Sequence, residues 1–165
     1  MEIIHENTLS YMDEMSRRFF WMNKKIDRMK SILNTKFCMP IFANLIHQEL
    51  AHSYPILADD INDIQEQFNY DANYFSVEGA TEDYSSVVEI AQKIYDYTIE
   101  TNQQLNNLIK VSIDEGDYNV YHLLIPISRN YSRYVANAIL ILDKAKQYNG
   151  NNHAMDKDSK EWWVL

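Results

Sequence analysis

Turn-forming residues are scarce in this chain, which has three glycines and three prolines among 165 residues. Tight turns depend on glycine and proline more than on other residues, so a fold of many short strands is excluded. A chain of this length forms one domain and buries about two-thirds of its unfolded surface. The sequence therefore predicts a single all-α domain made of a few long helices.

Cysteine and long apolar runs are also nearly absent. Cys38 is the single cysteine, which excludes an internal disulfide and a cysteine-rich zinc or iron–sulfur site and is typical of a reducing compartment. No apolar run approaches the roughly 18 residues that span a membrane. The N-terminal sequence MEIIHENTLS lacks the basic start and apolar segment of a secretion signal. We expect a cytoplasmic protein without a membrane partner.

Basic residues are the minority among the charged residues. The chain has 15 lysines and arginines against 24 acidic residues, and its net charge is −9. This balance repels the phosphate backbone of nucleic acids. We therefore expect no nucleic-acid partner.

What the chain does have is apolar residues at helical spacing in four long segments. The predicted helices span about residues 7–33, 40–68, 84–115 and 118–148. Pro55 should bend the second helix. The connection over residues 69–83 has no helical pattern; fully extended it covers about 50 Å, whereas a helix of about 30 residues is about 45 Å long. The sequence thus predicts a four-helix bundle with one long crossover between helices two and three.

The predicted helices define the domain organisation of the chain. Residues 1–150 should form the bundle, and residues 151–165 a C-terminal tail in which 155–165 is the candidate for a short docking helix. Trp162 and Trp163 should pack against a neighbouring subunit or the parent bundle, because exposed tryptophans are unfavourable.

Glu49 and His52 form the most informative pair of polar residues in the sequence. They lie three residues apart and project from the same turn of a helix. We expect this turn to face the core, because the local apolar stripe reads Phe42, Leu45, Glu49, His52, Ile56. A buried carboxylate and imidazole need partners. Four-helix bundles that hold two metal ions place a Glu-x-x-His motif in this setting.

Three segments resemble bacterial non-haem ferritins. HQELAH (residues 47–52) is similar to the Glu-x-x-His core of their second helix, YSSVVEIAQKIYDYTIETNQQLNNL (84–108) to their third helix, and DEGDYNVYHLL (114–124) to the turn into their fourth. The similarity covers about four-fifths of the chain and is ungapped through its second half. It implies a ferritin-like four-helix bundle, iron binding and storage, and a homo-oligomer.

The resemblance also implies which residues would hold iron. Ferritins hold one iron with a glutamate of helix one and the Glu and His of helix two. The helix-two Glu, a helix-three Glu and a Gln or Glu of helix four hold a second. Glu49 and His52 match. Thr98 stands at the helix-three position, and Tyr131 and Tyr134 at the helix-four positions, so the resemblance implies an eroded ferroxidase centre.

Two residues are candidates for the metal ligand on helix one. An ungapped alignment puts Ser16 at that position, and a two-residue shift puts Glu14 there, about 100° away from the centre of the apolar stripe. The predicted metal ligands are therefore Glu49, His52 and Glu14, for a single ion that the resemblance implies is iron. Carboxylate and imidazole ligands would also accept manganese(II) or zinc(II).

Two interpretations of the Glu49–His52 pair remain open. It binds a single metal ion, or it is a buried polar pair hydrogen-bonded internally or to Tyr131, Arg133 or Tyr134. The corresponding functions are an iron-binding or iron-storage protein with little or no ferroxidase activity, and a metal-free bundle with a structural or partner-binding role. Co-assembly of this chain with an active ferritin is compatible with both functions. A Dps-like protein that protects DNA ranks third, since the charge is wrong for DNA.

Overall fold

The computed structural model describes residues 3–162. It is all-α, as predicted, and within these residues it contains no strand. The elements are α1 (Glu6–Thr35), α2 (Pro40–Ile46), the π-helix η1 (His47–Ala51), α3 (Ser53–Gln67), α4 (Val87–Asp114), α5 (Tyr118–Tyr148) and α6 (Asn152–Ser159). No helix in this part of the chain is long and apolar enough to cross a membrane.

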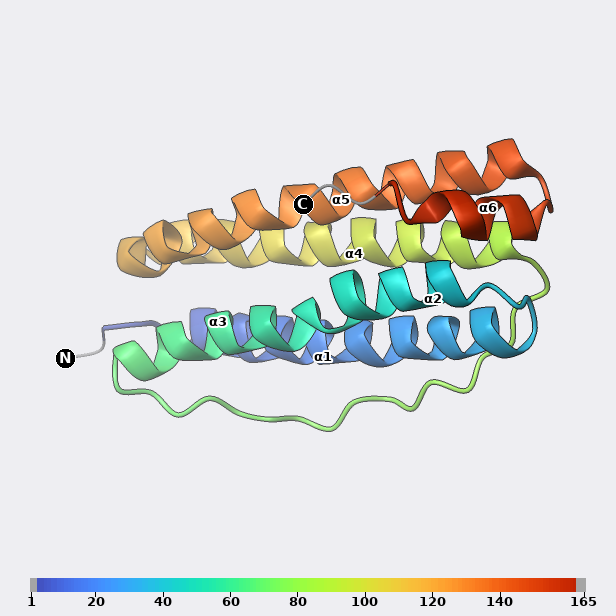
Figure 1. Ribbon diagram of the computed structural model, residues 1–165. Helices are drawn as coiled ribbons and strands as arrows, with labels where there is room; N and C mark the ends of the chain where they lie inside the picture. Colours follow the sequence, from blue (N-terminus) through green and yellow to red (C-terminus); the bar gives the residue numbers. More distant parts are fainter. Residues whose placement is uncertain (1–2, 163–165) are drawn as a thin grey trace.

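The long helices form a four-helix bundle (Figure 1). The segments α2, η1 and α3 continue one another as a single bent rod that runs antiparallel to α1, and α5 runs antiparallel to α4. The connection 68–86 crosses the length of the bundle, so that α4 starts at the same end as α2 (Figure 1). The predicted bundle with one long crossover is confirmed. It follows from the reach of an extended chain compared with that of a helix.

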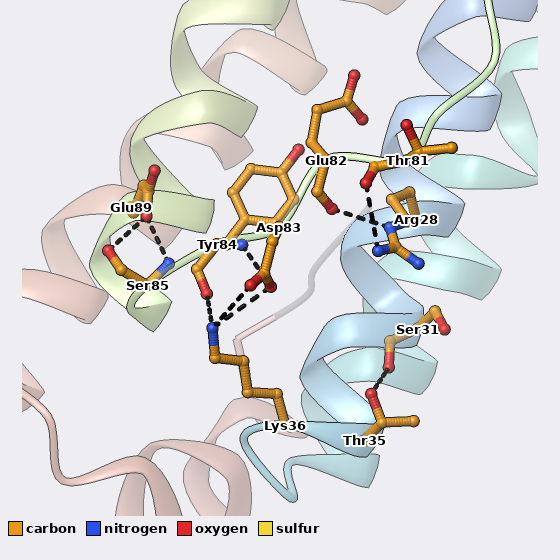
Figure 2. A network of polar contacts seen from close by, with 10 residues as sticks. All are labelled: Arg28, Ser31, Thr35, Lys36, Thr81, Glu82, Asp83, Tyr84, Ser85 and Glu89. Atoms are coloured by element: carbon orange, nitrogen blue, oxygen red, sulfur yellow. Dashed lines mark hydrogen bonds and ion pairs between the residues drawn. The ribbon is translucent and has the colours of Figure 1, made fainter.

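The crossover is fastened to α1 by side chains of that helix and of Lys36, the residue that follows it. Lys25, whose side chain is 2% exposed, pairs with Glu82 and lies 3.0 Å from Glu78 Oε1. Figure 2 shows the end of the crossover, where Arg28 Nε donates to the Glu82 carbonyl at 2.9 Å and Lys36 Nζ donates to the Tyr84 carbonyl at 2.6 Å. The segment therefore has a defined path although it lacks secondary structure.

Helix α4 begins at Val87, three residues after the predicted start, because of its N-terminal cap. The Ser86 hydroxyl accepts a hydrogen bond from the Glu89 amide at 3.0 Å. The Glu89 carboxylate in turn accepts from the Ser85 amide at 2.6 Å (Figure 2). This reciprocal arrangement of Ser and Glu three residues apart resembles a capping box and defines the first turn.

The C-terminal segment docks on its own bundle. Helix α6 lies against α2 and starts before the predicted 155–165 stretch. Its Asp156 Oδ1 accepts a hydrogen bond from the Phe42 amide at 2.8 Å, which satisfies a free amide in the first turn of α2. The Trp162 ring packs against Phe42 and Tyr148, with centroids 6.1 Å and 5.8 Å apart. Of the two predicted anchors Trp162 is thus placed, and Trp163 lies outside the described residues.

Candidate functional site

Glu49 and His52 do not face the core. Both are exposed, so their expected burial is wrong. The core-facing positions of this rod are Ile46, Leu50 and Tyr54, which are 0%, 3% and 0% exposed. Phe42 of the predicted stripe is buried, but beyond it the buried positions lie one or two residues later than predicted. The two polar members of the stripe therefore stand on the solvent side.

The π-helix explains this displacement. The buried residues Phe42, Ile46, Leu50 and Tyr54 recur at intervals of four, and in an α-helix each such step would drift by about 40° around the axis. The wider π turn over His47–Ala51 absorbs the drift and keeps all four on one face. A run of exact four-residue intervals is therefore the sequence signal that would have identified the true stripe.

Pro55 and Asn23 account for the local backbone. Proline has no amide hydrogen, so Pro55 cannot donate to the carbonyl four residues earlier, that of Ala51. Instead Asn23 Nδ2, on α1, donates to the Ala51 carbonyl at 2.7 Å. Pro55 was expected to bend the helix; the irregularity present is a π turn over His47–Ala51, just before the proline, and Asn23 ties it to α1.

Glu14 is separated from the other two predicted ligands. It is exposed and forms an ion pair with Arg17 at 3.6 Å. Asn23 of α1 contacts η1 through its hydrogen bond to the Ala51 carbonyl. Glu14 lies about 13 Å from Asn23 along the axis of α1, at about 1.5 Å per residue. Within residues 3–162 no group of three His, Cys, Asp or Glu side chains is placed to hold a metal ion. The three-residue ligand set is therefore not assembled among these residues, and metal binding by Glu49 and His52 alone stays a prediction.

A tyrosine cluster fills the middle of the bundle. Tyr54 of α3 and Tyr131 of α5 are both fully buried, and their hydroxyl oxygens lie 2.9 Å apart. The Tyr134 ring stacks on Tyr131 with centroids 5.1 Å apart, and Phe19 of α1 packs against both Tyr54 and Tyr131 at 6.0 Å. Residues from α1, α3 and α5 thus meet where the resemblance places the helix-four iron ligands.

The cluster is electrically neutral. Burial raises the pKa of Tyr54 well above its usual range, and the neighbouring Tyr131 raises it further. Burial likewise raises the pKa of the Tyr131 phenol. Thr98, at the helix-three ligand position, donates its hydroxyl to the Ile94 carbonyl at 2.6 Å. These neutral groups satisfy one another and supply none of the carboxylates that a pair of iron ions needs, so the residues do not fit a di-iron centre.

The alternative polar-pair interpretation is wrong in its stated form. Tyr131 pairs with Tyr54 rather than with Glu49 or His52. Across the described chain, no hydrogen bond or ion pair involves the Glu49 side chain. The His52 ring instead contacts the ring of His47 at 4.1 Å between centroids. Sequence reasoning missed both Tyr54 and His47, because each depends on the phase of the π turn.

Comparison with known proteins gives a likeness in structure but not in sequence. The chain matches no protein-family model and none of the curated proteins with which it was compared. Among solved structures, an open-pore ferritin from the archaeon Archaeoglobus fulgidus superposes with a TM-score of 0.89 at 16% identity, covering 96% of this chain and 97% of that one.

Two further structures extend this likeness. A closed form of the Archaeoglobus fulgidus ferritin, engineered by mutagenesis, gives a TM-score of 0.86 at 16% identity over 94% of this chain and 95% of that one. The Chlorobium tepidum ferritin gives 0.84 at 16% identity over 98% and 99%. The protein therefore has the ferritin-like fold over its whole described length.

Proposed function

We propose that this chain is an iron-storage subunit that assembles with copies of itself and has no di-iron centre of its own. The observation that carries the proposal is the near-complete coverage of both chains in the superposition on ferritins, with TM-scores up to 0.89. In this proposal, storage depends on the assembled shell rather than on the bundle interior. It can therefore persist when the bundle interior is occupied by Tyr54 and Tyr131.

An acidic surface supports the storage part of the proposal. Four exposed carboxylates follow α3: Asp59, Asp60, Asp63 and Glu66. Partial burial raises the pKa of the Asp60 carboxyl, and the negative charges of Asp63 and Asp59 raise it further. Carboxylates crowded in this way gain from a bound cation, because it relieves their mutual repulsion. They are suited to hold iron at the start of mineral growth.

The proposal keeps the predicted single iron ion at Glu49 and His52 but changes the character of its site. The pair stands at the surface and Glu14 takes no part in it. Two ligands open to water make a weak, exchangeable site, unlike an enclosed ferroxidase centre. Removal of His52 by His52→Ala should lower iron(II) binding measured anaerobically.

The experiment that tests the function is iron loading of the purified protein. Iron(II) is added in air, the protein is separated by gel filtration, and iron and native mass are measured together. We expect a homo-oligomer, smaller than or built differently from the closed ferritin cage, that retains many iron atoms per subunit. Asp60→Asn with Asp63→Asn should lower the retained iron, with the assembly unchanged.

A metal-free bundle that binds a partner is the second candidate. The absence of a three-ligand group in residues 3–162 favours it. A monomer, or an oligomer that retains no iron, would support this candidate and contradict storage. If iron is retained only when an active ferritin is added and the two proteins elute together, co-assembly is the function.

A further inference from the structure

The π turn brings together two histidines that an ordinary helix would separate. His47 and His52 are five residues apart, and at about 100° per residue they would point about 140° apart around an α-helix. Here the His52 amide donates to the His47 carbonyl at 3.1 Å, the i to i+5 bond of a π-helix. The residues therefore stand one above the other, with ring centroids 4.1 Å apart and the planes at 62°.

Asp27 of α1 fixes one of the two rings. Its Oδ1 lies 2.7 Å from His47 Nδ1. A carboxylate can only accept a hydrogen bond, so His47 Nδ1 is the donor and its Nε2 carries the free lone pair. A carboxylate behind an imidazole in this way orients the ring and makes its other nitrogen a better metal ligand.

We infer that His47 and His52 together bind one divalent transition-metal ion of borderline softness, of which zinc(II) is the representative. Imidazole nitrogen is a preferred ligand for zinc(II), copper(II) and nickel(II). No third ligand is provided by the described residues, so water completes the coordination. His52 is exposed, so its ring is free to turn toward the ion. The net charge of −9 also favours cation binding.

This site differs from the Glu49–His52 pair in its second ligand and does not depend on iron storage. Glu49 lies two residues from His47 on the same turn, so its side chain leaves the axis in a different direction. Asp27 acts as a positioning residue for His47. The pairing depends on the π turn, because an α-helical path through the same residues would separate the two rings.

Calorimetric titration of zinc(II) into the full-length, chelator-treated protein tests the inference. We expect one zinc ion per chain. His47→Ala and His52→Ala should each weaken binding at least tenfold. Asp27→Asn should weaken it about tenfold, the usual loss when the carboxylate behind a histidine ligand is removed. The matched control is His122→Ala, which removes an exposed histidine elsewhere and should not change the affinity. Glu49→Gln separates this site from the Glu49–His52 pair, because zinc held by His47 and His52 does not need the Glu49 carboxylate.

The same titration contains the results that would overturn the inference. These are no zinc binding by the unmodified protein, unchanged binding in His47→Ala, or loss of binding in Glu49→Gln. His52 is exposed, so His52→Ala should keep the fold and remains informative if His47→Ala does not fold. As a second measurement, zinc should raise the thermal midpoint of the unmodified protein but not of His52→Ala. Both readouts use zinc alone, so failure of iron loading does not affect them.

Discussion

The hydroxyl of Tyr54 and that of Tyr131 share one hydrogen bond, 2.9 Å long, at the centre of the bundle. Both side chains are fully buried. The pair joins α3 to α5 across the core, with the Thr98 hydroxyl as a further hydrogen-bond partner of Tyr54 and that of Thr101 as a further partner of Tyr131. Buried tyrosine hydroxyls are costly when they lose their partner.

The first prediction concerns this pair. Tyr131→Phe should destabilise the protein by about 1–2 kcal/mol, because it removes the hydroxyl to which the buried Tyr54 hydroxyl is hydrogen-bonded. Tyr54→Phe should do the same to Tyr131. The double variant should cost much less than the sum of the two, since neither hydroxyl remains. Urea unfolding of all four proteins gives the coupling energy; additive costs would show that the hydroxyls are independently satisfied.

The second prediction concerns the π turn. Asn23→Ala removes the donor to the Ala51 carbonyl and should cost about 1 kcal/mol. Pro55→Ala supplies a backbone amide in its place, so the same Asn23→Ala change should cost less in a Pro55→Ala background. Chemical unfolding of the four proteins measures both. An equal cost in the two backgrounds would mean that Pro55 does not create the need for Asn23.

The third prediction is a pH dependence that arises from Lys25. Burial acts to raise the pKa of the Glu82 carboxyl, but the hydrogen bond from Lys25 and the charges of Lys25 and Arg28 outweigh it, and the pKa is lowered. A carboxyl with a lowered folded-state pKa stabilises the protein above its unfolded value. That contribution is lost as the pH falls from about 4.5 through the folded-state pKa.

Lys25→Met should remove this acid dependence and lower the stability at neutral pH by about 2 kcal/mol, because the Glu82 carboxylate loses its partner. Lys24→Met is the matched control, since Lys24 is exposed and forms no ion pair among the described residues. Unfolding free energies measured from pH 7 down to pH 3 compare the three proteins. If Lys25→Met keeps the same slope as the unmodified protein, another carboxyl is responsible.

The fold could be predicted from the sequence, and the site could not, for a physical reason. The crossover could be predicted because it depends only on the length of the connecting segment. The long helices could be predicted because their apolar periodicity extends over many turns, so an error of one residue in the position of the buried face does not change the assignment. Whether Glu49 and His52 face the core or the solvent depends on the geometry of a single helical turn. One π turn, coupled to Pro55 and satisfied by Asn23 from another helix, moves both side chains from the core to the surface.

The same shift explains what replaced the expected ligands. That Thr98 and Tyr131 carry no carboxylate is visible in the sequence itself, and the eroded centre that the resemblance implies stays a prediction. What fills the space could not be seen, because the predicted stripe places Glu49 and His52 in the core and leaves out Tyr54. The contact between Asp27 and His47 joins two different helices. No local sequence pattern predicts such a contact.

The last prediction is that the unmodified protein oxidises iron(II) no faster than the background reaction in air. Fast oxidation needs two ions held by ionised carboxylates, and the core offers the neutral Thr98, Tyr54 and Tyr131. Restoring the missing donors with Thr98→Glu and Tyr131→Gln should not raise the rate, because Glu49 and His52 face solvent and cannot complete the centre. The buried carboxylate should instead lower stability.

Oxygen uptake after a few equivalents of iron(II) per subunit decides the matter, with a ferritin that has an intact centre as the positive control. Uptake at the background rate by both the unmodified and the doubly substituted protein is the expected result. Fast uptake by the unmodified protein would mean that other residues assemble a di-iron centre. A rate restored only in the double variant would mean that Glu49 and His52 turn inward in solution, and that the π turn is not fixed.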